Sequence, residues 1–165
     1  MASAIPVAWS TLMRLLRETD WPSLPESSGV RVWFGDPAAP PETVGATDES
    51  VVVIGQVETD ESEFATAGRI STAEQFGLLV VVSTMVRPRS PEQVACRLFE
   101  LADVVERIIG TTVRHQDRPP EFATAEIWKW EVARRRPIVG PMNEGFGGQV
   151  ELLVRVTARL PEEVR

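Results

Sequence analysis

The stretch QFGLLVVVSTMV, residues 75–86, constrains the fold of this chain more than any other segment. It is apolar over almost its whole length and rich in β-branched residues, a pattern typical of a strand that is buried on both faces. Such a strand needs neighbouring strands at its edges and other elements over its faces. We therefore predict a central strand of a sheet over about residues 75–86.

The strongest helix signals follow directly after this strand. Ser90 stands at the N-cap, Pro91 at the first helical position and Gln93 completes a capping box, while Gly110 is expected to mark the C-terminal end. Apolar residues recur between them at helical spacing and form one stripe. They are Val94, Leu98, Leu101, Ala102, Val105, Ile108 and Ile109. This helix is predicted to pack against the sheet.

Weaker patterns predict most of the remaining elements. Apolar residues at helical spacing indicate a helix over about residues 6–19, and short β-branched runs indicate strands over residues 30–34 and about 50–58. The polar segment 59–74 fits either a loop or an extension of the neighbouring strands.

Two alternating segments near the C-terminus predict two more strands. In TAEIWKWEVARR, which starts at Thr124, we expect Trp128, Trp130 and Val132 to share a buried face. GQVELLVRVTARL, which starts at Gly148, alternates more regularly. Its residues predicted to face the core are Val150, Leu152, Val154, Val156 and Ala158.

Together these elements predict an α+β fold: a mixed, mainly antiparallel sheet of about five strands with two helices packed on one face. The 165 residues fit a single domain, with long loops at about 35–49 and 135–148. No run approaches 18 consecutive apolar residues, and no basic region precedes the apolar part of the N-terminus. We therefore expect neither a membrane span nor a secretory signal.

Residues that usually carry catalysis are sparse. His115 is the single histidine and Cys96 the single cysteine, so metal sites built from several such ligands are excluded. The glycines of NEGFGG, residues 143–148, lead into a predicted strand and not into a helix, so they do not form a phosphate-binding loop of the usual kind. We expect no catalytic residue, no cofactor and no metal, and hence not an enzyme.

The connection between the last two strands carries apolar side chains beside three arginines. Apolar side chains on a protruding hairpin are unfavourable unless a partner covers them, and a neighbouring subunit is the natural partner. The predicted interface residues are Arg134, Arg135, Arg136, Ile138, Val139, Met142 and Phe146. The alternative is a small phosphate- or nucleotide-binding domain, or an enzyme, that uses the three arginines and the glycine-rich loop.

The net charge of −7 is unevenly distributed along the chain. Residues 1–82 carry 4 basic and 12 acidic side chains, and residues 83–165 carry 13 and 12. Broad binding of duplex nucleic acid needs many lysines and arginines, so this composition argues against it. An acidic surface that keeps DNA from sticking remains compatible with the sequence.

The order and character of several stretches resemble the tail terminator proteins of long-tailed bacteriophages. The resemblance spans nearly the whole chain and rests on a leading helix followed by VRVWFGDP, VVVIGQVE, EQFGLLVVVSTMV, SPEQVACRLFELADVVERIIG and GGQVELLVRVTARL. It rests on pattern and size, and no residue can be matched individually to a binding residue of that family.

The resemblance implies a virion protein of the tail or neck, made in the host cytoplasm. Such a subunit forms a homohexameric ring on the end of the tail tube and contacts the tail tube protein and the head-side connector protein. DNA passes through the acidic lumen of the ring without specific binding. The residues expected to line that lumen are Asp48, Glu49, Glu58, Asp60, Glu61 and Glu63.

Overall fold

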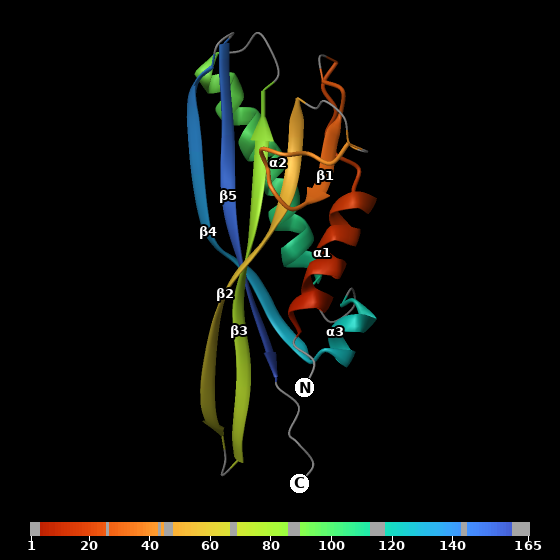
Figure 1. Ribbon diagram of the computed structural model, residues 1–165, viewed down its shortest axis with the longest axis vertical. Coiled ribbons are helices and arrows are strands. Elements are labelled where there is room, and N and C mark those ends of the chain that lie inside the picture. Colours follow the sequence, from red (N-terminus) through yellow and green to blue (C-terminus); the bar gives the residue numbers. More distant parts are fainter. Residues whose placement is uncertain are drawn as a thin grey trace.

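The computed structural model of the chain has the α+β fold that the sequence predicts (Figure 1). It describes residues 4–25, 27–42, 44, 48–66, 69–85, 90–112, 118–142 and 145–159. In chain order, the elements in this part of the chain are α1 (Ile5–Glu18), β1 (Val30–Phe34), β2 (Glu49–Thr66), β3 (Arg69–Thr84), α2 (Pro91–Thr112), α3 (Pro120–Thr124), β4 (Ile127–Met142) and β5 (Gly145–Arg159).

The five strands form one mixed sheet in the order β1-β2-β3-β5-β4. β1 and β2 are parallel, and every other neighbouring pair is antiparallel. β3 is the middle strand, as the long apolar run predicts. β2 with β3 and β4 with β5 form two long hairpins that are joined through β3 and β5.

Helices α1 and α2 pack against the same face of the sheet. The buried alternate residues of the strands, including Val51, Val80 and Leu152, form one core cluster with Leu12 of α1 and Leu98 of α2. The side chains of Trp33, Val52 and Val81 are also buried but lie outside this cluster, on the opposite face. We call that opposite face the open face, because no helix in the described residues packs against it.

The start of α2 is built as the sequence predicts. The backbone N–H of Gln93 donates to Ser90 Oγ at 3.3 Å, and the backbone N–H of Ser90 donates to Gln93 Oε1 at 3.0 Å. The end of α2 was predicted too early, since the helix passes Gly110 and ends at Thr112. The short helix α3 has no counterpart among the predicted elements.

The predicted long loop at 135–148 is wrong, because most of it is strand. β4 and β5 pair continuously from Pro137 opposite Val150 to Met142 opposite Gly145, and residues 143–144 lie outside the described residues. Pro137 and Pro141 are tolerated in β4 because it is an edge strand, where a missing N–H need not break the ladder. Of the two options for residues 59–74, the extension of the strands is the one observed, since β2 and β3 run through most of this segment.

The predicted shared face of Trp128 and Trp130 is also wrong. A register shift between Ile127 and Lys129 inserts one extra residue into β4. Such a bulge reverses the alternation of side chains. Ile127 and Trp130 are therefore both buried, whereas Trp128 is 54% exposed.

The fit of α2 against the sheet depends on Gly148. An alanine Cβ at this position would lie 2.7 Å from Leu98 Cδ1 and 2.8 Å from the carbonyl oxygen of Ile138. We expect Gly148→Ala to lower the free energy of unfolding by about 1–3 kcal/mol, the usual cost of overpacking. Urea denaturation followed by circular dichroism measures the change.

Gly77→Ala is the matched control. Its Cβ would meet Leu153 Cδ1 at 2.8 Å, the end of a flexible side chain that can rotate away. We expect a smaller loss than for Gly148→Ala. Equal losses in the two variants would show that the contacts of Gly148 with Leu98 and with the backbone of Ile138 do not set the cost.

Candidate assembly surface

The sheet separates the three consecutive arginines. A second register shift in β4, between Val132 and Arg134, sets the pairing so that Arg135 lies opposite Leu152 and faces the helices. Its guanidinium binds Asp103 Oδ1 at 2.7 Å and Glu106 Oε1 at 3.2 Å, both on α2. The same group lies 5.2 Å from the centroid of the Phe99 ring, within range of a cation–π interaction. Arg135 is thus held by contacts within its own chain.

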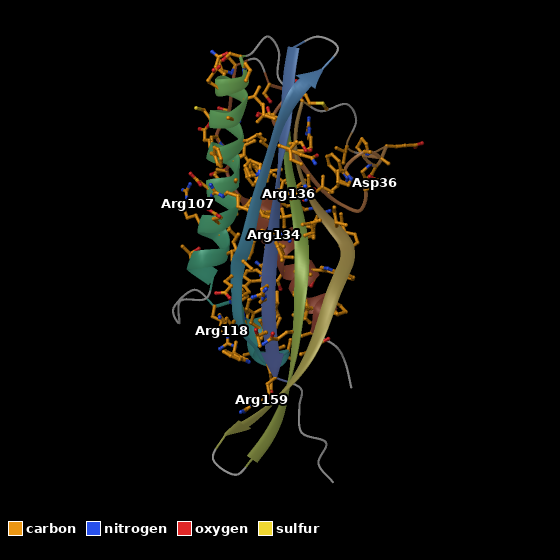
Figure 2. All side chains as sticks on the ribbon, turned by 90° about the vertical axis from the view of Figure 1, so that its left-hand side faces the viewer. Asp36, Arg107, Arg118, Arg134, Arg136 and Arg159 are labelled. Carbon is orange, nitrogen blue, oxygen red and sulfur yellow. The ribbon has the colours of Figure 1, made fainter. Side chains whose placement is uncertain are left out.

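Arg134 and Arg136 lie on the open face. The register places Arg134 opposite Leu153 and Arg136 opposite Glu151, both on β5 (Figure 2). Both arginines are exposed, and neither forms an ion pair with any residue that the structure describes. The three predicted interface arginines therefore do not converge on one site: one ties β4 to α2, and two are available to a partner.

The predicted apolar interface residues lie toward the end of the β4–β5 hairpin. Ile138 is 44% exposed and Val139 is 37% exposed, so both present apolar surface at the sheet edge. Met142 and Phe146 belong to the last paired positions of the hairpin, and their side chains lie outside the described structure. Trp128, which the sequence placed in the core, adds a third exposed apolar residue to β4.

A groove of about 490 Å³ runs beside this part of β4, at the end of the open face. The segment between β1 and β2 forms its other side, and the indole N–H of Trp33 donates to the carbonyl oxygen of Asp36 at 3.0 Å. Asp48, one of the predicted lumen residues, also borders the groove. Among the lining residues are Trp33, Pro37, Pro40, Met85 and Ile138.

The prediction of Glu49 as a lumen residue is wrong, because the side chain is buried. Its exposed fraction is 1%, and Arg97 of α2 binds both carboxylate oxygens at 2.8 Å. The hydroxyl of Thr84 donates to Oε2 at 3.0 Å. Glu49 occupies an alternate position of β2 with the core residues Val51 and Val53, so its side chain points to the same buried face. The sequence contains this alternation, but a carboxylate is ordinarily expected at the surface.

The buried carboxylate of Glu49 is ionised. Burial alone raises the pKa of this group, but hydrogen bonds from Arg97, Ser27 and Thr84 and the charge of Arg97 outweigh that effect. The pKa therefore lies below its ordinary value of 4.5. The same partners hold Arg97 protonated: burial lowers its pKa, while Glu49 and Glu100 raise it more. The pair links the start of β2 to α2.

The other predicted lumen residues lie on the distal half of β2. Glu58, Asp60, Glu61 and Glu63 pair in register with residues of β3, and their side chains lie outside the described structure. We call residues 57–66 and 69–78 the distal hairpin; its last rows, residues 63–66 opposite residues 69–72, extend beyond the end of β5 (Figure 1). β1 pairs only with Glu49–Val53, so among the described strands the distal part of β2 has β3 as its single neighbour.

The described residues contain few side-chain clusters of the kind found at catalytic or metal-binding sites. No set of three His, Cys, Asp or Glu side chains in this part of the chain is placed to hold a metal ion. Cys96 is exposed on α2, and His115 lies outside the described residues. None of the described helices is long and apolar enough to cross a membrane.

Comparison with known proteins identifies no relative. No protein-family model matches the chain, and no curated protein matches it.

Replacing Glu49 by glutamine tests the buried ion pair. Glu49→Gln leaves the charge of Arg97 buried without its main counterion, and removing one partner of a buried pair typically costs about 3–5 kcal/mol. We expect a loss of that order at pH 7. Because the folded pKa of Glu49 is lowered, its contribution is complete above its ordinary pKa of 4.5 and is lost as the pH falls below it. The difference between the variant and the wild type should therefore shrink in acid.

Glu100→Gln is the control, measured by urea denaturation over the same pH range. Glu100 binds Arg97 at 2.8 Å, but its side chain is 50% exposed, so we expect a loss below about 1 kcal/mol. A Glu49→Gln variant as stable as the Glu100→Gln variant at pH 7 would contradict the role of the buried pair.

Proposed function

We propose that the chain is a ring-forming structural subunit of the kind found at the end of bacteriophage tail tubes. The observation that carries the proposal is the exposed apolar surface near the hairpin end of the edge strand β4, where Ile138 borders the groove and Val139 follows it. Exposed apolar residues grouped along one strand mark a surface that a protein partner covers. The groove beside Ile138 continues this surface onto the open face.

The shape of the subunit supports a ring over a closed dimer. The β4 edge with the open face is one candidate contact surface, and the distal hairpin, which projects at one end of the molecule, is another (Figure 1). Contacts between two different surfaces of identical subunits are heterologous, and they generate a ring when the rotation closes. The resemblance to tail terminators sets the expected ring at six copies.

In this role the protein belongs to the tail or neck of the virion. The ring caps the tail tube protein on one side and meets the head-side connector protein on the other, and DNA passes through without specific binding. Glu49 has no part in the lumen of such a ring. The acidic residues left for it are Asp48 and those carboxylates of the distal hairpin that do not contact another copy.

The alternative, a phosphate- or nucleotide-binding domain, has one observation in its favour: Arg134 and Arg136 are free of ion pairs within the described residues. Against it, Arg135 faces the helices, and the glycines near these arginines lie in paired strands, where their N–H groups do not converge as at a helix N-terminus. A thermal shift assay with inorganic phosphate and with ATP tests this alternative. If it holds, the ligand raises the melting temperature of the wild type and not that of Arg134→Ala/Arg136→Ala.

The ring is tested by native mass spectrometry and negative-stain electron microscopy of the purified chain. We expect a species at six times the subunit mass of 18.3 kDa and images with a central channel. Ile138→Asp/Val139→Asp should shift the population toward monomer, because the charges oppose burial of this edge. Cys96→Asp, an exposed position on α2, is the control and should leave assembly unchanged.

The terminator role needs a second measurement with the tail tube protein encoded in the same genome. Rings should be found at tube ends, and tube growth should stop when they are added. A wild-type chain that stays monomeric even in the presence of tubes would contradict the proposal.

A further inference from the structure

The open face is basic, although the whole chain is acidic. Outside the distal hairpin, five arginines and one lysine have register positions on it, against two carboxylates, and the ammonium group of Lys129 pairs with Glu131 at 3.1 Å. These basic residues are Arg31, Lys129, Arg134, Arg136, Arg155 and Arg159, and the carboxylates are Glu131 and Glu151. On the distal hairpin itself, the register places Glu58 and Asp60 on the same face. Between them lie the half-buried apolar residues Ile54, Leu79 and Leu153. The face therefore fits a partner that is acidic and partly apolar.

The distal hairpin has the opposite charge. Residues 58–63 of β2 carry four carboxylates and no basic side chain. The strands here have few neighbours: β5 accompanies β3 only as far as Ala73 opposite Arg159, and beyond that row the two strands of the hairpin pair only with each other in the described structure. An isolated two-stranded hairpin is marginally stable in water, so a docking partner would stabilise it.

Within one chain the acidic hairpin is remote from Arg134 and Arg136. Arg134 pairs through Leu153 of β5 with Leu79 of β3, whereas Glu61 pairs with Glu74 of β3. These two positions of β3 are five residues apart. Five residues of a strand span about 16 Å, and β4 and β2 are separated by about 14 Å across the sheet. The carboxylates of Glu61 and Glu63 can therefore reach Arg134 and Arg136 only between different copies of the chain.

We propose that the acidic distal hairpin of one copy docks on the open face of the next copy, with its carboxylates against Arg134 and Arg136. This inference rests on the proposed ring and names the contact that builds it. The contact joins two different surfaces of the same chain, as a ring requires. It would also cover the apolar side chains of Leu79 and Leu153.

Docking on the face fits β4 better than addition of a strand to its edge. Pro137 and Pro141 lack the N–H groups that an added strand would need, and prolines on an edge strand are a common protection against such pairing. Arg134 and Arg136, in contrast, form no ion pair with the residues that the structure describes, and each can bind a carboxylate through two parallel hydrogen bonds.

Charge reversal on each side tests the contact. The face variant is Arg134→Glu/Arg136→Glu, and the hairpin variant is Glu61→Arg/Glu63→Arg. We expect each variant alone to lose assembly, by about tenfold or more in the dissociation constant, as for close charge pairs at other interfaces. Native mass spectrometry at low salt measures the assembled fraction, and circular dichroism checks that each variant is folded.

Mixing the two variants is the decisive measurement. At the four contact positions, the face variant then carries acidic residues at 134, 136, 61 and 63, and the hairpin variant carries basic residues at all four. Every contact between unlike copies is complementary, so we expect the mixture to assemble with the two variants alternating. Arg17→Glu/Arg107→Glu, which reverses two exposed arginines on the helices, is the matched control and should assemble like the wild type.

The possible failures are distinguishable. A wild type that assembles while both variants assemble equally well would overturn this contact and leave the proposed ring intact. A face variant that fails while the mixture also fails would show that the open face contacts a different part of the neighbouring copy, and would overturn this contact too. A wild type that never assembles would contradict the ring and this contact together.

Discussion

The structure depends on the fact that helices cover only one face of its sheet. That face is fixed by a continuous apolar core and by the buried ion pair between Glu49 and Arg97, which joins the start of β2 to α2. Arg97 also donates to the carbonyl oxygen of Pro22, so the segment after α1 is tied to the same point. With α1 and α2 both committed to this face, no described helix covers the opposite face, which is buried around Trp33, Val52 and Val81 and exposed around Arg134 and Arg136.

Most of the strands and both long helices could be predicted from the sequence because their patterns follow from local chemistry. The alternation in β5 and the capping box of α2 are short-range patterns, and both appear in the structure as expected. The segment 135–148 was misjudged because glycine and proline are ordinarily loop signals. A segment rich in glycine and proline forms a strand only when a neighbouring strand pairs with it. The sequence of the segment itself does not contain that information.

The candidate site was harder to predict because its geometry depends on two bulges in β4. Strict alternation places Trp128 on the buried face with Trp130, whereas the bulge between Ile127 and Lys129 exposes it. No local feature of the sequence marks this bulge. The role of each charged residue was equally hard to predict. Glu49 and Glu61 are both carboxylates of β2, but Glu49 is buried beside an arginine and Glu61 lies on the distal hairpin. Only the three-dimensional arrangement separates a structural charge from one that is available to a partner.

The bulge after Val132 has a consequence for assembly that composition alone would not suggest. It gives three identical side chains in succession two different tasks. Arg135 holds β4 against Asp103 and Glu106 of α2, so the edge strand that bears the contact surface is anchored to the helical layer. Arg134 and Arg136 point their charge to the other side, where a rigid sheet spaces them at alternate positions. A surface held in this way is preorganised for binding, because docking on it requires little further ordering of the backbone.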